Sequence, residues 1–132
     1  MTPKKILVVE DDNSTRQLLK LLLQKNYHVE CSEDGFEAML YLSNGNIPDL
    51  ILLDVSMPNI SGMSFLNNIR QSGFFKDIPI IILSGIETVA ELNAVKKLGI
   101  QGFLKKPFRP TELYQKINEV FDPIEADMHY VG

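Results

Sequence analysis

Five short apolar runs recur along the chain, at residues 6–9, 27–31, 50–53, 78–83 and 100–104. The runs at 50–53 and 78–83 are apolar at almost every position, which is typical of strands buried on both faces. In 27–31 apolar and polar residues alternate, which indicates an edge strand with one wetter face. The pattern therefore predicts five strands, one of them at an edge of the sheet.

A segment with the apolar spacing of a helix follows each of these runs. The first is predicted to begin at Asn13 or Ser14, as its N-cap, with a core face drawn from Leu18, Leu19, Leu22 and Leu23. The others are predicted at residues 36–43, 61–71, 87–97 and 110–121. Strand–helix alternation with short connections implies a parallel sheet with right-handed crossovers and helices on both faces. Periodicity is lost after Phe121, so we expect one domain over residues 1–121 and a tail or the start of a linker over residues 122–132.

Composition and charge narrow the class of protein. The net charge of −4 argues against a nucleic-acid surface as the main role, because phosphate binding needs a basic face. A single cysteine, Cys31, excludes an internal disulfide framework and favours a reducing compartment. No apolar run approaches the ~18 residues of a transmembrane helix, and residues 1–5 leave no room for a signal peptide. We therefore expect a cytoplasmic protein without direct contacts to nucleic acid or membrane.

Polar residues stand where four of the predicted strands end. Asp11 and Asp12 follow the first strand, Asp54 the third, Ser84 the fourth and Lys106 the fifth. In a parallel sheet these ends meet at one edge, which is where open α/β sheets bind ligands. An apolar strand has no structural reason to end in Asp54 unless that carboxylate serves a site.

The types of these residues point to phosphoryl chemistry. Three neighbouring carboxylates repel one another unless a cation lies among them, and their oxygens suit a hard divalent ion such as Mg²⁺. An ammonium and a hydroxyl are what a tetrahedral anion needs around its oxygens. The set therefore indicates a carboxylate nucleophile that attacks a phosphoryl group, with metal and lysine neutralising charge.

Four motifs match one family in order and spacing: VVEDD at 8–12, DVSMPNISG at 54–62, ILSG at 82–85 and FLKKPF at 103–108. With them, roughly residues 4–121 resemble a response-regulator receiver domain, the phosphoacceptor half of two-component signalling, in the manner of a single-domain chemotaxis regulator. The resemblance implies a flavodoxin-like, three-layer fold with a five-stranded parallel sheet of order 2-1-3-4-5.

The resemblance also implies roles for the site residues. Asp54 would take a phosphoryl group from a phosphohistidine on a sensor histidine kinase or histidine phosphotransfer protein. Asp12 would bind Mg²⁺, with Mn²⁺ as a possible substitute, Asp11 would assist directly or through water, and Asp54 and the main-chain carbonyl of Ser56 would complete the metal site.

Further implied roles concern the phosphorylated state. Lys106 would pair with one phosphoryl oxygen and precede a cis peptide bond to Pro107, and Ser84 would hydrogen-bond another oxygen. Phe103 occupies the family's aromatic switch position, although it also suits a core residue. Lys105 duplicates the lysine, but alternation along the strand points it the other way.

Movement of Ser84 and Phe103 would alter a surface on the fourth helix, fifth strand and fifth helix. That surface would contact a downstream protein or an output domain missing from this chain, or form a homodimer. Candidate residues on it are Glu87, Glu91, Lys97, Tyr114 and Lys116.

The chain departs from the family pattern at two positions, and two other classes of protein share some of its features. Phe103 has no hydroxyl, and Gly85 stands where alanine is common. A metal-dependent phosphatase of the aspartyl-phosphate type shares the nucleophile, lysine and Mg²⁺, but usually carries a second Asp two residues after the nucleophile, where this chain has Ser56. A flavodoxin-like nucleotide or flavin module would need a glycine-rich loop after the first strand, where acids stand instead.

Overall fold

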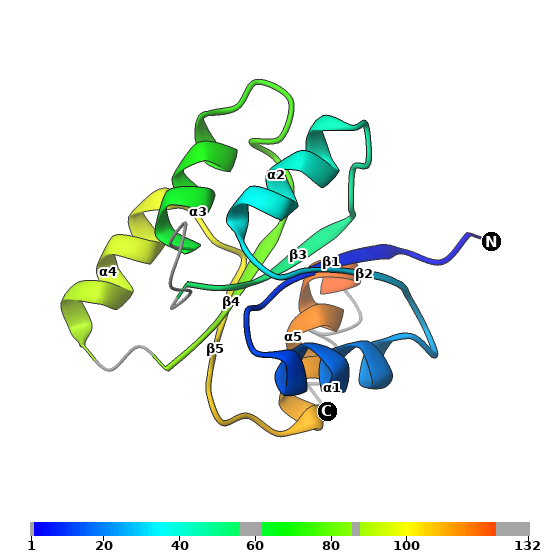
Figure 1. Ribbon diagram of the computed structural model, residues 1–132. Helices are drawn as coiled ribbons and strands as arrows, with labels where there is room; N and C mark the ends of the chain where they lie inside the picture. The colour runs from blue at the N-terminus through cyan, green and yellow to red at the C-terminus, as the bar shows by residue number, and fades with distance from the viewer. Residues whose placement is uncertain (1, 56–61, 86–87, 124–132) are drawn as a thin grey trace.

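The computed structural model describes residues 2–55, 62–85 and 88–123, which form one parallel sheet with helices on both faces (Figure 1). The strands are β1 (Lys5–Val9), β2 (His28–Ser32), β3 (Leu50–Asp54), β4 (Ile80–Ser84) and β5 (Gly102–Lys105). Neighbouring strands pair in parallel in the order β2-β1-β3-β4-β5. The predicted flavodoxin-like fold and strand order are confirmed, including the position of β2 at an edge.

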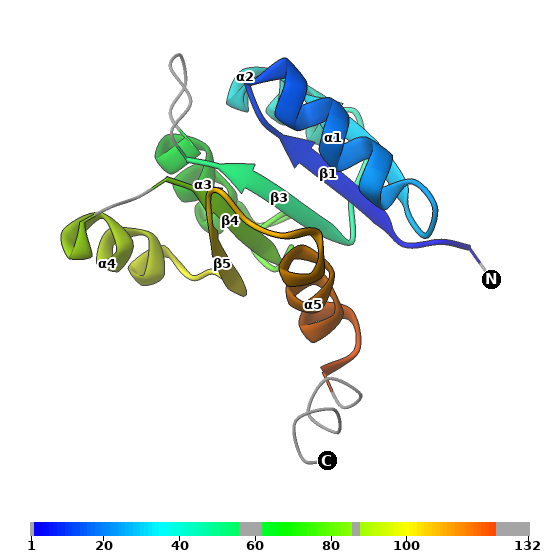
Figure 2. The same ribbon diagram turned by 90° about the horizontal axis from the view of Figure 1, so that it is seen from below.

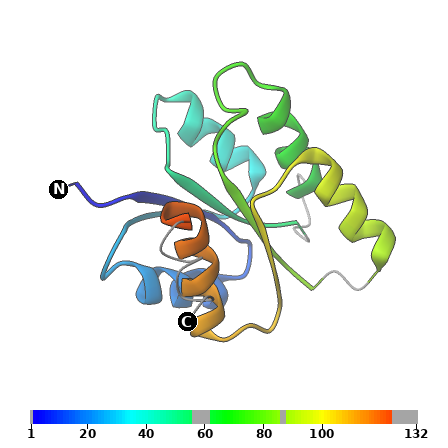
Figure 3. The ribbon, with the colours of Figure 1, turned by 180° about the vertical axis from the view of Figure 1, so that it is seen from behind.

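Five helices connect these strands: α1 (Asn13–Leu23), α2 (Gly35–Ser43), α3 (Gly62–Gln71), α4 (Val89–Leu98) and α5 (Pro110–Phe121). Figure 2 shows α1 and α5 side by side on one face of the sheet, with the other helices beyond it. The view from behind places α5 in front of the sheet and α4 at its far edge, beyond β5 (Figure 3). The result is a three-layer α/β/α arrangement.

Alternation along the central strands divides the core into two halves. Leu7, Val9, Ile51 and Leu53 pack towards α2, α3 and α4, where Phe65 is the largest buried side chain. Ile6, Val8, Leu50 and Leu52 pack towards α1 and α5. Because both faces of β3 are covered, all five of its residues are buried, the last being Asp54. The continuous apolar run in the sequence follows from this double burial.

Several predicted boundaries differ from the structure, most of them by one residue and those of β4, β5 and α4 by more at one end. β4 begins at Ile80, because the amide of Ile78 donates to the carbonyl of Phe75 in the preceding turn. β5 covers Gly102–Lys105 rather than residues 100–104. α4 begins at Val89, because the Thr88 hydroxyl accepts a hydrogen bond from the amide of Glu91 and caps the helix. The predicted start at Glu87 lies outside the described residues.

The start of α1 also differs from the prediction. Its N-cap is Asp12, not Asn13 or Ser14, and the Asp12 carboxylate accepts hydrogen bonds from the amide (2.8 Å) and the hydroxyl (2.6 Å) of Thr15.

The prediction for the core face of α1 wrongly included Leu18. Leu19 and Leu23, four positions apart, are fully buried, while Leu18 is 51% exposed. A residue next to Leu19 is turned about 100° around the helix axis, so Leu18 faces away from the sheet.

Candidate functional site

The carboxyl ends of β1, β3, β4 and β5 bring polar side chains to one edge of the sheet. Asp54 ends β3 and is 5% exposed, and Ser84 ends β4 and is fully buried. Asp54 pairs in register with Leu83, which brings Ser84 to the neighbouring position. Lys106 follows β5, and its amide donates to the carbonyl of Ser84. The predicted convergence of Asp54, Ser84 and Lys106 is therefore observed.

The Lys106 side chain lies between two carboxylates. Its Nζ donates a hydrogen bond to Oε1 of Glu10 and lies 3.3 Å from Oδ2 of Asp54. Both carboxylates are buried, Glu10 with 1% and Asp54 with 5% exposure. The bond between Lys106 and Pro107 is cis, as the resemblance implied.

Glu10 is the site residue that the sequence did not identify. It directly follows β1, and its carboxylate is buried at the end of the sheet, beside the carboxylate of Asp54 and the ammonium of Lys106. The available signal was its place at the start of the acidic run, one residue before the predicted pair. Side chains alternate between the two faces of a strand, and this alternation continues to the residue that directly follows it. The burial of Glu10 could therefore have been predicted from the sequence.

The electrostatics of this cluster are those of a crowded acidic site. Burial, together with the neighbouring carboxylate of Asp54, raises the pKa of Glu10 from 4.5 to about 8 despite the nearby ammonium. Burial alone would lower the pKa of Lys106, but its hydrogen bond to Glu10 and the charge of Asp54 outweigh burial and raise it. Lys106 is therefore a firmly charged cation, and the surroundings of Glu10 favour the protonated form of its carboxyl.

Carboxylate oxygens of Glu10, Asp11 and Asp54 lie within 4.8 Å of one another, close enough to share one metal ion. Oε2 of Glu10 is buried and has no hydrogen-bond partner among the described residues, so it is an oxygen that a cation would satisfy. A set made of carboxylate oxygens suits a hard divalent cation that keeps part of its water shell. The residues present therefore fit a divalent metal.

Asp12, the predicted direct ligand, is not part of this cluster. Its Oδ2 is taken up by Thr15, and these hydrogen bonds hold the pKa of Asp12 below its usual value. The acidic pair that the fold presents with Asp54 is Glu10 and Asp11, one residue earlier than predicted. Asp12 stabilises the start of α1 instead.

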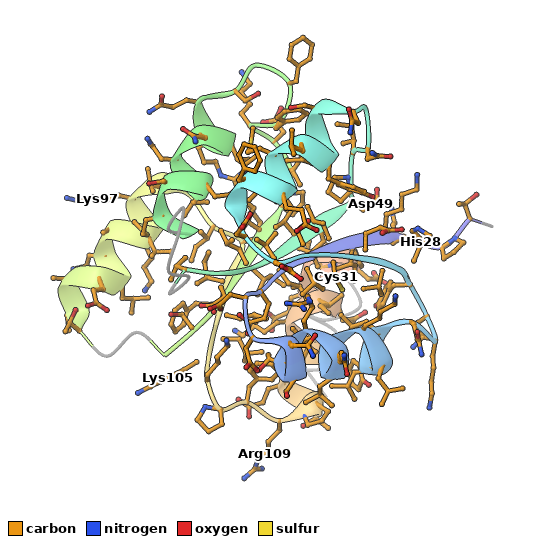
Figure 4. The ribbon with its side chains drawn as sticks, viewed as in Figure 1. His28, Cys31, Asp49, Lys97, Lys105 and Arg109 are labelled. Atoms are coloured by element: carbon orange, nitrogen blue, oxygen red, sulfur yellow. The ribbon has the colours of Figure 1, made fainter. Side chains whose placement is uncertain are left out.

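The remaining predicted residues are placed as follows. Phe103 is partly buried and packs against the core between the sheet and α2, α3 and α4. Lys105 is exposed and extends away from the sheet in Figure 4, as alternation predicted. The metal-binding role given to the carbonyl of Ser56 lies outside the described residues.

Two glycines beside the site have opposite surroundings. A Cβ on Gly62, at the start of α3, would lie 2.5 Å from the carbonyl oxygen of Asp54 and closer still to Cα of Val55. Gly62 is therefore required for the close approach of α3 to the end of β3. A Cβ on Gly85 would meet nothing within 4 Å. Alanine would thus fit at this position.

The residues predicted for an output surface are placed as follows, except Glu87, which lies outside the described residues. Glu91 and Lys97 are exposed on α4, and Figure 4 shows Lys97 extending outward. Lys116 is partly exposed near β5, since its Cδ lies 3.9 Å from where a Cβ on Gly102 would be. Tyr114 was misplaced: its hydroxyl donates to the carbonyl of Leu22, so it faces α1. In the described part of the chain, no helix is long and apolar enough to cross a membrane.

Comparison with known proteins points to one family. The family model for the response regulator receiver domain matches residues 6–118. Response regulator MprA from Mycobacterium sp. (strain KMS) is 38% identical over 126 residues, which is 95% of this chain and 54% of that relative. A probable transcriptional regulator, ycf27 of Guillardia theta, is 36% identical over 90% of this chain and 46% of its own length. The chain thus spans about half the length of these curated relatives.

Solved structures give the same result. Chemotaxis protein CheY4 of Vibrio cholerae matches with a TM-score of 0.82 and 33% identity, over 90% of this chain and 99% of that one. The Mn²⁺-bound form of response regulator Rcp1 matches with a TM-score of 0.77 and 28% identity, over 90% of this chain and 94% of that one.

Proposed function

The chain belongs to the response regulator receiver domain family, and from that premise we propose that Asp54 is its phosphoacceptor. The observation that carries the proposal is the buried carboxylate of Asp54, held 3.3 Å from the Lys106 ammonium and clustered with Glu10 and Asp11. A nucleophile flanked by a fixed cation and by metal-binding oxygens is the arrangement that phosphoryl transfer requires.

The proposed donor is a phosphohistidine on a sensor histidine kinase or a histidine phosphotransfer protein. One Oδ atom of Asp54 attacks phosphorus, and the bond from phosphorus to the imidazole nitrogen breaks. The nitrogen keeps the electron pair and takes a proton from solvent, while the phosphoryl group ends as an acyl phosphate on Asp54. The chain promotes its own phosphorylation and, with water as the nucleophile, its own dephosphorylation, and is not a conventional turnover enzyme.

The proposed metal is Mg²⁺, with Mn²⁺ as a substitute, held by Glu10, Asp11 and Asp54 and by the carbonyl of Ser56. Bound there, it would neutralise charge on the phosphoryl oxygens and on the three carboxylates. Lys106, which lies between Glu10 and Asp54, would then be placed to pair with a phosphoryl oxygen on Asp54. Oxygen ligands and Mn²⁺ binding by the similar Rcp1 support this assignment.

The proposed readout begins at Ser84, whose hydroxyl turns towards a phosphoryl oxygen. Phe103, already partly buried between the sheet and α4, then moves further inward. α4 is suited to respond because it buries Val95 while Val89 at its start is 74% exposed. The altered surface of α4, β5 and α5 would bind a downstream protein or an output domain, or form a homodimer.

The remaining assignments are part of the same proposal. Residues 1–121 are the receiver and residues 122–132 a tail or linker, in a cytoplasmic protein without direct nucleic-acid contacts. The phosphatase alternative gains no support, because the family matched is the receiver and Ser56 stands at the position of the acid/base.

The test is incubation with a small phosphodonor such as acetyl phosphate, with and without Mg²⁺. Wild type should gain one phosphoryl group in the presence of Mg²⁺, and Asp54→Asn should gain none. Equal incorporation by the two proteins would overturn the assignment of Asp54. Steady release of phosphate from small phosphoesters would favour the phosphatase instead.

A further inference from the structure

Arg16, on the first turn of α1, reaches back over the acidic loop that follows β1. Its Nη1 donates to the main-chain carbonyl of Glu10 (2.8 Å) and more weakly to that of Asp11 (3.4 Å). Its Nη2 donates to Oδ1 of Asn13 (2.8 Å) and lies 3.7 Å from the carboxylate of Glu33. The Arg16 side chain is 14% exposed, so most of it is enclosed by these partners.

This contact completes the anchoring of Glu10. The amide of Glu10 donates to the carbonyl of Ser32 at the end of β2 (3.0 Å), and its carbonyl accepts from Arg16. With both peptide groups held, the backbone at Glu10 has one orientation. That orientation sends the side chain into the cluster with Asp54 and Lys106.

Helix stability does not account for the position of Arg16. A cation near the start of a helix opposes the helix dipole, and the acid that favours the dipole here is the N-cap Asp12, which Thr15 already holds in place without Arg16. The pair with Glu33 contributes little, because Glu33 is 68% exposed and exposed ion pairs are worth about 0–1 kcal/mol. What remains is the pair of carbonyls that Arg16 holds in the acidic loop.

We propose that Arg16 is a positioning residue for the metal site: it orients the main chain of Glu10 and Asp11 so that their carboxylates meet that of Asp54. The inference rests on the proposed function, because it concerns the same site. Arg16 itself touches neither metal nor phosphoryl group. Residues that orient metal ligands typically change metal affinity by ~10- to 100-fold when they are replaced.

The chain contains a matched control in Arg70. Its guanidinium also holds main-chain carbonyls, those of Gly99 (2.8 Å), Lys76 (2.9 Å) and Ile78 (2.8 Å). These carbonyls precede β4 and β5, at the edge of the sheet opposite the acidic cluster. Loss of Arg70 therefore costs packing and hydrogen bonds without touching the metal ligands.

The experiment is a calorimetric titration with Mg²⁺ of wild type, Arg16→Met, Arg16→Lys, Glu33→Gln and Arg70→Met, with thermal unfolding of each in EDTA. Arg16→Met should weaken Mg²⁺ binding by ~10- to 100-fold. Arg16→Lys should weaken it by less, because one ammonium replaces the two-pronged guanidinium group of arginine. Glu33→Gln should bind as wild type does. Arg70→Met should unfold at a lower temperature and keep the wild-type affinity. Arg16→Lys serves alone if Arg16→Met does not fold.

Wild-type affinity in both Arg16 variants would overturn the inference, as would an equal loss of affinity in Arg70→Met. Those outcomes leave the proposed function intact, provided that wild type binds Mg²⁺ and accepts a phosphoryl group in the same preparation. Failure of wild type to do either would instead remove the proposed function, and this inference with it.

Discussion

The Nζ atom of Lys106 donates a hydrogen bond to the carboxylate of Glu10, across the 96 residues that separate them in the chain. The same ammonium lies 3.3 Å from Asp54, so one cation serves two buried carboxylates. Removing a cation from such a pair leaves buried charge without compensation. Lys106 therefore both stabilises the acidic edge of the sheet and carries the positive charge that an incoming phosphoryl group needs.

Replacement of Lys106 by methionine should slow phosphoryl uptake from acetyl phosphate by about 10²–10³-fold, the usual effect of losing one group that stabilises transition-state charge. Lys105→Met is the matched control, because Lys105 is adjacent, exposed and directed away from the sheet (Figure 4). It should react at the wild-type rate. Equal slowing in both variants would contradict the role given to Lys106.

Glu10 should make the metal-free protein less stable as pH rises. Its pKa is raised from 4.5 to about 8, so the fold favours the protonated form. That contribution is complete below pH 4.5 and is lost as pH rises through about 8. Glu10→Gln mimics the protonated carboxyl and should flatten this slope in urea unfolding with EDTA, while abolishing tight Mg²⁺ binding. An unchanged slope would show that Glu10 is ionised in the folded protein at neutral pH.

Asp12 should behave as a helix cap and not as a metal ligand. Asp12→Asn keeps an oxygen that accepts from Thr15, so it should retain Mg²⁺ affinity and lose only the part of the stability that depends on the charge of Asp12. The lowered pKa of Asp12 stabilises the fold above its unfolded pKa of 3.8, and this contribution disappears as pH falls through the folded value. Asp12→Asn should remove that part of the acid sensitivity. A large loss of Mg²⁺ affinity would restore Asp12 as a ligand.

Gly62 and Gly85 should respond differently to alanine. At Gly62 the added methyl would overlap the main chain of Asp54 and Val55, so Gly62→Ala should cost about 1–3 kcal/mol of unfolding free energy and reduce phosphoryl uptake. At Gly85 the space is open, so Gly85→Ala should fold and accept phosphate as wild type does. Chemical denaturation and the acetyl phosphate assay measure both effects. Similar behaviour of the two variants would contradict the close approach at Gly62.

The fold could be predicted because the doubly buried strands are almost uniformly apolar. Residues 50–53 have no polar side to present to water, and that pattern, with helices between the strands, admits few topologies. The edge strand was equally readable from the alternation around Val29. The ends of the strands could be predicted less accurately. β4 begins only after Pro79, because Ile78 takes part in a hydrogen-bonded turn with Phe75, and the spacing of apolar residues does not reveal such hydrogen bonds.

The strand ends predict the outline of the site, but not which of the acids at residues 10–12 lie in it. Asp54 and Ser84 end their strands and Lys106 directly follows β5, so the parallel register brings the three residues together. Residues 10–12, directly after β1, are three consecutive acids, and each could in principle lie in the cluster with Asp54 or cap α1. Which one caps α1 depends on where the helix begins, and that was set by the hydrogen bonds from Thr15 to Asp12.

The most direct test of the central claim is to locate the phosphoryl group by mass spectrometry of peptides after reaction with acetyl phosphate and Mg²⁺. Asp49→Asn is the matched control for Asp54→Asn, because Asp49 precedes the same strand at its other end, where it accepts from the amide of Lys5. Wild type and Asp49→Asn should carry one phosphoryl group on Asp54, and Asp54→Asn none. A phosphoryl group on any other residue of wild type, or an unchanged yield in Asp54→Asn, would contradict the account.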